Sequence, residues 1–130
     1  MTTPQQFLES FLRERAAAYT ETRARLAPVY AKYFGEPLLQ RAEYFMPKDI
    51  ARAVVEDVRQ SDGVASAVTR EHLQSADIRF RYRLTAAGES WRIIGVDHEC
   101  FFCRSIGQSE GSLCQKCGGE GWYEPERNAV

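Results

Sequence analysis

The sequence has little histidine and almost no net charge, and its four cysteines are confined to the last third of the chain. It contains two histidines, and 17 lysines and arginines stand against 18 aspartates and glutamates, for a net charge of −1. A dedicated nucleic-acid binder would carry a basic surface, so nucleic acid is not an expected partner. Two histidines without a surrounding motif also give little support to an imidazole-based active site.

No segment has the composition of a membrane span, and the first residues, MTTPQQFLES, lack the basic and apolar stretches of a secretory signal. Repeats, low-complexity stretches and long linkers are absent as well. With 130 residues, 44% of them hydrophobic, the chain has enough apolar material for one core. We therefore expect a cytoplasmic protein with an α+β domain over residues 1–98, a zinc knuckle over residues 99–125 and a flexible tail over residues 126–130.

The four cysteines form two Cys-x-x-Cys pairs, Cys100 with Cys103 and Cys114 with Cys117, separated by ten residues. Two such pairs at this separation supply the four thiolates of a closed, tetrahedral zinc site. Disulfides need an oxidising compartment, a redox site needs only one pair, and iron–sulfur ligands usually follow other spacings. The pattern favours structural Zn²⁺, with the redox, iron–sulfur and disulfide alternatives left open.

The residues after the second pair, Cys114-Gln-Lys-Cys117-Gly-Gly119-Glu-Gly121, fit C-x-x-C-x-G-x-G. This segment resembles one cysteine-rich repeat of the DnaJ-type chaperones. Glycines there permit positive φ and a close approach of backbone amides to the thiolates. The first pair lacks the glycines and the chain has no His-Pro-Asp signature, so the resemblance implies zinc and a knuckle rather than chaperone activity. His98 is the only nearby ligand of another type, and four thiolates already fill the coordination shell.

An amphipathic helix is predicted near the N-terminus. Thr3 offers an N-cap, Pro4 a first helical residue, and Gln6 the glutamine of a capping box. An apolar stripe at helical spacing is expected to face the core: Phe7, Leu8, Phe11 and Leu12. Four charged residues are assigned to the solvent side: Glu9, Arg13, Glu14 and Arg15.

A second helical piece is predicted after a break. The first helix is expected to run towards Leu26 and to break near Ala27, because Pro28 cannot donate a backbone hydrogen bond. The second piece then ends at Gly35. Its aromatic residues are expected to face inward: Tyr30, Tyr33 and Phe34.

The pattern of the remaining chain predicts one short helix and then a sheet. Residues 50–59 are predicted as an amphipathic helix whose apolar face carries Ile50, Val54 and Val58. Alternation then predicts strands over residues 64–73, 78–84 and 90–97, with a turn at Gly88 between the last two. The expected fold class is α+β, with N-terminal helices packed on one face of a curved antiparallel sheet.

Helices followed by long antiparallel strands, the last of which reads Ser90-Trp-Arg-Ile-Ile-Gly-Val-Asp97, are similar to the cone-shaped fold of the nuclear transport factor 2-like superfamily over roughly residues 3–98. Members of that superfamily include polyketide cyclases, ketosteroid isomerases, dehydratases, transport adaptors and bacterial toxin-immunity proteins. The resemblance therefore implies a fold without selecting a function. The cysteine-rich C-terminal segment is an addition to the usual pattern.

Three arginines in the 78–84 strand, Arg79, Arg81 and Arg83, share one face of the predicted sheet because side chains alternate along a strand. The opposite face takes Ile78, Phe80, Tyr82 and Leu84. An arginine face is either solvated or a surface for an anion or acidic partner, since guanidinium groups bind carboxylates and phosphates bidentately.

His72 and Asp97 are further candidates for ligand or partner binding. In an enzyme of this fold they would stand with Glu71, His98 and Tyr82 as acid–base candidates, although no recognised motif organises these residues. Glu71 and His72 are adjacent in a strand, so they are expected to point to opposite faces of the sheet.

We expect a zinc-stabilised binding protein without catalytic activity, whose ligand is a protein or a small molecule and whose sheet can support a homodimer. One alternative is a cofactor-independent pocket enzyme of the isomerase, cyclase or dehydratase class, with His72 or Asp97 in a deep apolar cavity. A second alternative is a bacterial immunity protein or chaperone-like adaptor that uses the arginine face as its contact surface.

Overall fold

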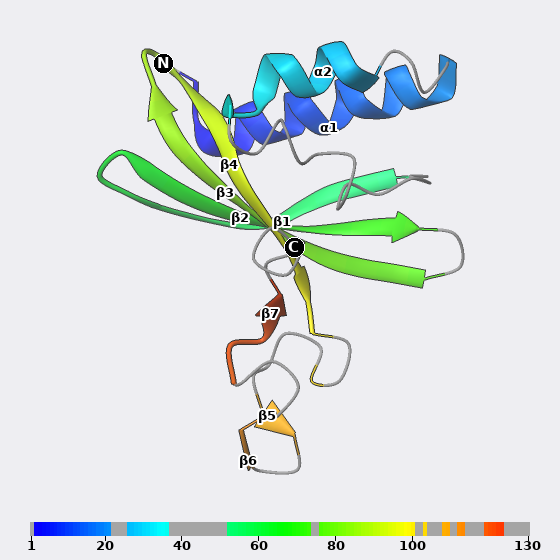
Figure 1. Ribbon diagram of the computed structural model, residues 1–130, viewed down its shortest axis with the longest axis vertical. Helices are drawn as coiled ribbons and strands as arrows, with labels where there is room; N and C mark the ends of the chain where they lie inside the picture. Colours follow the sequence, from blue (N-terminus) through cyan, green and yellow to red (C-terminus); the bar gives the residue numbers. More distant parts are fainter. Residues whose placement is uncertain are drawn as a thin grey trace.

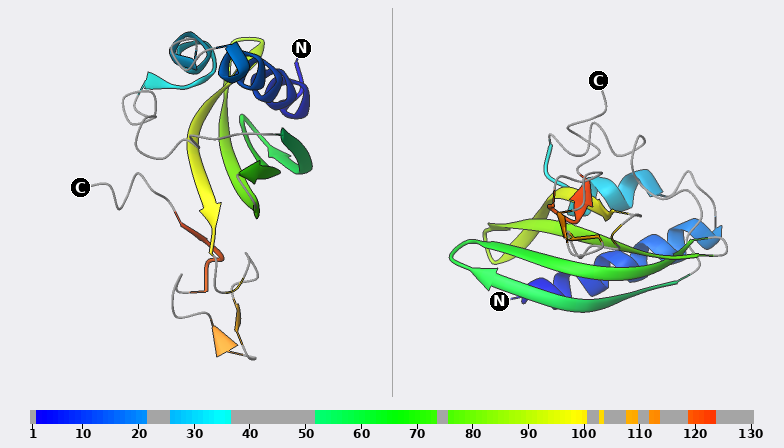
Figure 2. Two further views of the ribbon diagram at one scale, coloured as in Figure 1. Left: turned by 90° about the vertical axis from the view of Figure 1, so that its right-hand side faces the viewer. Right: turned by 90° about the horizontal axis from the view of Figure 1, so that it is seen from below.

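The computed structural model describes residues 2–21, 26–36, 52–73, 76–100, 103, 108–109, 112–113 and 119–123. Two helices, α1 (Pro4–Glu21) and α2 (Leu26–Tyr33), precede β1 (Arg52–Ser61), β2 (Val64–Leu73), β3 (Ala76–Ala87), β4 (Ser90–Glu99) and β7 (Trp122–Tyr123). These strands form one antiparallel sheet in that spatial order, and β5 (Gln108–Ser109) pairs with β6 (Ser112–Leu113). Both helices cover one face of the twisted sheet (Figures 1 and 2), which confirms the α+β class.

Helix α1 begins with the predicted capping box. The Gln6 amide donates to Thr3 Oγ1, and the Thr3 amide donates to Gln6 Oε1, both at 3.1 Å. The predicted break near Ala27 is wrong in position, because α2 already begins at Leu26. Pro28 therefore lies in the first turn of α2, where its missing N–H has no helical partner to lose. Within the described part of the chain, neither helix is long and apolar enough to cross a membrane.

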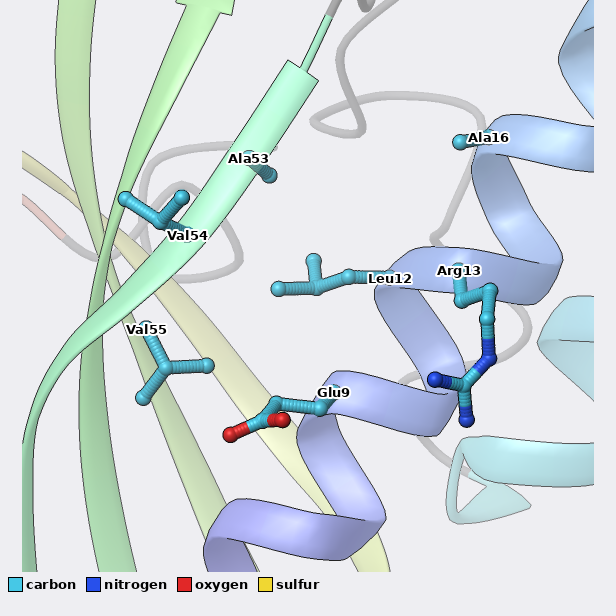
Figure 3. Close-up of a pocket in the computed structure, with 7 residues that line it drawn as sticks. All are labelled: Glu9, Leu12, Arg13, Ala16, Ala53, Val54 and Val55. Atoms are coloured by element: carbon cyan, nitrogen blue, oxygen red, sulfur yellow. The ribbon is translucent and has the colours of Figure 1, made fainter.

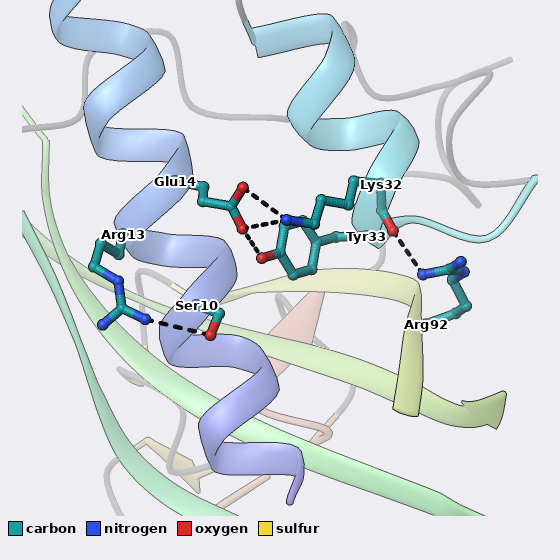
Figure 4. A network of polar contacts seen from close by, with 6 residues as sticks. All are labelled: Ser10, Arg13, Glu14, Lys32, Tyr33 and Arg92. Carbon is teal, nitrogen blue, oxygen red and sulfur yellow. Dashed lines mark hydrogen bonds and ion pairs between the residues drawn. The ribbon is translucent and has the colours of Figure 1, made fainter. Parts of the chain in front are cut away.

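Polar contacts join α1, α2 and the sheet (Figure 4). Glu14 of α1 accepts hydrogen bonds from Lys32 Nζ at 2.9 and 3.0 Å and a further one from the Tyr33 hydroxyl. Arg92 Nη1 of β4 donates to the carbonyl of Lys32 at 2.6 Å. Just beyond α2, the Gly35 amide donates to the Ile93 carbonyl at 2.8 Å. The end of α2 is thus held against β4.

Residues 52–61 form strand β1, where an amphipathic helix was predicted. The strand pairs with β2 along its length, from Arg52 opposite His72 to Ser61 opposite Val64. Val54, placed by the helix prediction on the apolar face, is 57% exposed. Ile50, which also belongs to that predicted face, lies outside the described residues.

A β-bulge changes which side chains of β1 face the core. It lies just after Val55 and adds one residue to β1. The side chains of β1 that pack against the core are therefore Ala53, Val55 and then Val58, with a step of two followed by a step of three. This spacing breaks the alternation expected of a strand, and Val54 and Val58, which the helix prediction put on one face, point to opposite faces of the sheet.

The three later strands are confirmed, with turns at glycines. Gly63 and Gly88 adopt positive φ values of 72° and 62° in the β1–β2 and β3–β4 turns. The inner face of the sheet and the two helices enclose one core, and its largest fully buried apolar side chains are those of Leu8, Phe11, Tyr82, Leu84, Trp91, Ile93 and Val96. The core therefore fills the space between the helices and the central strands.

Candidate functional site

A network of polar side chains is buried between α1 and the inner face of the sheet. Arg15 donates from Nη2 to Glu71 Oε1 at 2.7 Å and from Nη1 to the Tyr82 hydroxyl at 2.9 Å. The second oxygen of Glu71 accepts from the Tyr82 and Thr69 hydroxyls, both at 2.7 Å. All four side chains belong to fully buried residues. Both carboxylate oxygens of Glu71 are thus engaged by donors from within the protein.

The prediction that Arg15 lies on the solvent side of the first helix is wrong, because Arg15 is fully buried. It lies four residues after Phe11 and therefore on the same helical face, with its guanidinium carbon 5.2 Å from the centroid of the Phe11 ring. Its spacing from Phe11 was the signal that could have found it. Its partner Glu71 lies 56 residues away, and nothing in the local sequence pairs the two.

The electrostatics of the network hold Arg15 and Tyr82 each in one protonation state. Burial lowers the pKa of Arg15, but the neighbouring Glu71 and Tyr82 outweigh burial and raise that pKa above its ordinary value. Burial raises the pKa of Tyr82 well above its ordinary value, and the charge of Arg15 offsets part of the rise. Arg15 is therefore a cation and Tyr82 a neutral donor at neutral pH. Such a network fixes the packing of α1 on the sheet.

The outer face of the sheet carries the predicted arginines. Phe80, Tyr82 and Leu84 are buried on the inner face, so the alternation predicted for this strand is confirmed. Arg79 Nε lies 3.1 Å from Glu56 Oε1, and Arg70 Nη2 of the neighbouring strand lies 3.2 Å from the other Glu56 oxygen. One carboxylate thus offsets part of the positive charge of Arg70 and Arg79, so this part of the outer face is less suited to binding anions than the sequence indicated.

Asp97 joins the other two arginines on the same outer face. Its Oδ2 accepts from Arg81 Nε at 2.8 Å and from Arg83 Nε at 3.2 Å. Arg83 Nη2 also lies 3.2 Å from Asp97 Oδ1, as an ion pair without hydrogen-bond alignment. The Asp97 side chain is fully covered, whereas each arginine side chain is 31% exposed. The carboxylate is therefore buried beneath two guanidinium groups.

The two histidines lie apart from the buried network. His72 Nδ1 is 2.9 Å from Asp77 Oδ1 on the outer face, and its side chain is 31% exposed. Glu71 and His72 thus point to opposite faces, as predicted. His98 is partly buried and contacts the carbonyl of Glu99 at 3.3 Å. The structure brings Glu71 together with Tyr82, but places His72 and Asp97 on the other side of the sheet.

A groove of about 500 Å³ lies between α1 and β1 (Figure 3). Leu12 and Ala16 of α1 face Ala53 and Val55 of β1 across it, and the charged residues Glu9 and Arg13 lie on the α1 side. This volume falls in the range of small-ligand sites. The groove is lined by none of the residues that the sequence singled out as acid–base candidates.

The first cysteine pair lies where β4 ends. Cys100 is fully buried and Cys103 is 4% exposed. The Cys100 amide donates to the Gly121 carbonyl at 2.8 Å, next to the pairing of Glu99 with Trp122. Cys114 and Cys117 lie outside the described residues, and the part of the chain that the structure describes holds no cluster of three or more metal-ligating side chains.

Comparison with protein-family models, curated proteins and solved structures finds no match to this chain.

Proposed function

We propose that this chain is a non-catalytic binding protein of the nuclear transport factor 2-like type, with its C-terminal segment clamped to the end of the sheet by one Zn²⁺. The ligands are four thiolates: Cys100, Cys103, Cys114 and Cys117. The observation that carries the proposal is the 2.8 Å hydrogen bond from the Cys100 amide to the Gly121 carbonyl. It joins the first cysteine pair to the chain that follows the second pair.

The length of the intervening chain supports a single four-thiolate site. Cys117 precedes Gly121 by four residues, which span at most about 14 Å when extended. Gly121 is hydrogen-bonded to Cys100, so the length of the chain keeps Cys117 within reach of the first pair. Gly119 and Gly121, the two glycines of the C-x-x-C-x-G-x-G pattern, have φ values of 86° and 83°. Most other residues are strained at such φ values, which explains why glycine stands there.

Four thiolates favour Zn²⁺ in a closed, structural role, because a catalytic zinc keeps one position open for water or substrate. Burial of Cys100 and Cys103 agrees with a site that is sealed from solvent. Such a site contributes on the order of 10 kcal/mol in zinc-finger peptides, as much as the net stability of a whole domain. Zinc would therefore decide whether the C-terminal segment stays on the sheet.

The placement of the carboxylates supports binding rather than catalysis. A general acid or base must reach its substrate within hydrogen-bond distance. Glu71 is fully buried with both oxygens engaged, and Asp97 is covered by Arg81 and Arg83. These groups hold α1 and the outer face in place. The groove between α1 and β1 offers a ligand-sized volume without an acid–base pair of this kind.

Cobalt substitution tests the ligand set, because Co²⁺ in a tetrahedral thiolate site gives strong visible and near-ultraviolet bands. The proposal predicts these bands in the wild-type protein and their loss or shift in Cys103→Ser and Cys117→Ser. His98→Asn serves as the matched control and is expected to leave the bands unchanged, since His98 is not a ligand. Weak bands in the wild type, or bands that persist unchanged in both serine variants, would contradict the proposed site.

A further inference from the structure

We propose that Arg81 and Trp122 are positioning residues of the zinc site, which raise its metal affinity by docking β7 on the end of β4. The inference rests on the proposed function, because it takes the four cysteines to be the ligands. Neither residue has a thiolate, imidazole or carboxylate group with which to bind Zn²⁺. Their effect on the metal is exerted through the backbone that joins β7 to the second cysteine pair.

Arg81 is held in place from one side. Its Nε donates to Asp97 at 2.8 Å, and the Asp97 carboxylate is fully buried. If the guanidinium moved away, the buried Asp97 carboxylate would lose one of its partners without gaining water in exchange. The loss of that partner would cost free energy. Arg81 is therefore fixed before β7 docks, so little conformational entropy is lost when the ring of Trp122 packs against it.

Trp122 meets Arg81 from the other side. The guanidinium carbon of Arg81 lies 5.1 Å from the centroid of the Trp122 ring, within the range of a cation–π contact. Trp122 is partly buried, although β7 contains only two residues. Figure 1 shows β7 beside the end of β4 that points away from the helices. The ring thus contributes a side-chain contact to a strand that has little backbone pairing.

The pairing of β7 with β4 is too short to be stable by itself. It comprises His98 opposite Tyr123 and Glu99 opposite Trp122. The next backbone hydrogen bond along the chain is the one from Cys100 to Gly121. The ring contact, the strand pairing and the first cysteine pair thus form one continuous junction. Any gain in docking at Trp122 also fixes the backbone at Gly121.

Docking and metal binding are consequently coupled. A docked β7 keeps the second cysteine pair near Cys100 and raises its effective concentration at the metal. By thermodynamic linkage, the factor by which docking raises zinc affinity equals the factor by which zinc favours docking. Weakening the contact between Arg81 and Trp122 therefore weakens zinc binding, although all four ligands remain.

Competition with a chromophoric chelator measures this effect as a zinc affinity. Removal of a cation–π contact predicts a loss of about three- to thirtyfold in Trp122→Ala. Trp122→Phe keeps a ring and is expected to retain most of the affinity, and Arg81→Lys keeps the charge and is expected to show an intermediate loss. The control is Arg59→Lys, whose wild-type side chain is 84% exposed, with unchanged affinity expected.

A double-mutant cycle and a quenching measurement complete the test. The double variant, Arg81→Lys with Trp122→Ala, is expected to bind zinc as tightly as Trp122→Ala alone. The contact that Arg81→Lys weakens is already absent in Trp122→Ala. Chelation of the wild type is expected to raise acrylamide quenching of the emission that Trp122→Phe removes. Protein without zinc would refute the proposed function. Bound zinc with equal affinity in Trp122→Ala and unchanged quenching would overturn the coupling alone.

Discussion

The guanidinium of Arg83 lies directly across Gly95 on the neighbouring strand. A Cβ atom built on Gly95 would lie 2.1 Å from Arg83 Nη2 and 2.2 Å from its Cζ, and the two residues are register partners between β3 and β4. Because position 95 has no side chain, the guanidinium can cross the strand to reach Asp97. A glycine in the middle of a strand, usually a weakness, here permits an ion pair.

Gly95→Ala is therefore expected to destabilise the fold by about 1–2 kcal/mol, since the added methyl group displaces Arg83 and leaves Asp97 with one partner fewer. Gly35→Ala is the control, because a Cβ there would lie 3.5 Å from Ile94, an ordinary contact, and its effect is expected within about 0.5 kcal/mol. Urea unfolding measures both. Equal midpoints for the two variants would show that the crossing of Arg83 over Gly95 contributes nothing.

Asp97→Asn tests the buried carboxylate itself. The substitution keeps the size of the side chain but leaves Arg81 and Arg83 without their counter-ion, so a loss of about 2–4 kcal/mol is expected. Asp57→Asn removes a carboxylate from an exposed pair, Arg59 at 3.3 Å, and is expected to cost less than about 0.5 kcal/mol. The comparison is made by urea unfolding at neutral pH. A small loss of unfolding free energy at both positions would mean that the charge of Asp97 contributes little to stability.

The buried pair of Arg15 and Glu71 predicts strong non-additivity. Arg15→Met or Glu71→Leu alone leaves one buried charge unpaired and is expected to cost about 3–5 kcal/mol. The double variant leaves no unpaired charge and is expected to lose less than the sum of the two, as a double-mutant cycle would show. Lys32→Met, from a pair whose lysine is 61% exposed, is the control with an expected loss below about 1 kcal/mol. Additive losses would argue against a direct coupling of Arg15 and Glu71.

Stability is expected to fall at high pH because of Tyr82. Burial raises the pKa of Tyr82 well above its ordinary value of 10, and burial also raises the pKa of Tyr30. Above pH 10 the unfolded chain releases phenolic protons that the folded chain retains, so the unfolded state binds fewer protons. The free energy of unfolding then decreases by up to about 1.4 kcal/mol per pH unit for each such tyrosine, whereas neither contributes a slope below pH 10.

Urea unfolding between pH 8 and pH 11 measures this slope. Tyr82→Phe and Tyr30→Phe are each expected to make the decrease above pH 10 shallower, whatever they do to stability at neutral pH. A stability that is flat up to pH 11 in the wild type, or a slope that Tyr82→Phe leaves unchanged, would contradict the assignment of this loss to the buried hydroxyl.

Features set by neighbouring residues were predictable from the sequence. The capping box of Thr3 and Gln6, the turn at Gly88, and the separate faces of Glu71 and His72 all depend on local spacing. The β1 strand was missed because its bulge interrupts the alternation by which a strand is recognised.

The buried network could not be predicted, because it depends on contacts between residues far apart in the chain. Charge alone placed Arg15 on the surface, and only the fold brings Glu71 and Tyr82 to it. Likewise, three arginines in alternation do not reveal that Asp97 forms ion pairs with two of them. The zinc prediction, in contrast, depends on the spacing of the two cysteine pairs, which can be read directly from the sequence.

The zinc content of the protein, purified without added metal and under reducing conditions, tests the central claim most directly. The account predicts one zinc per chain by elemental analysis, lost in Cys117→Ser, and a melting temperature that falls when a strong chelator removes the metal. Protein that contains no zinc, or that melts at the same temperature before and after chelation, would contradict it.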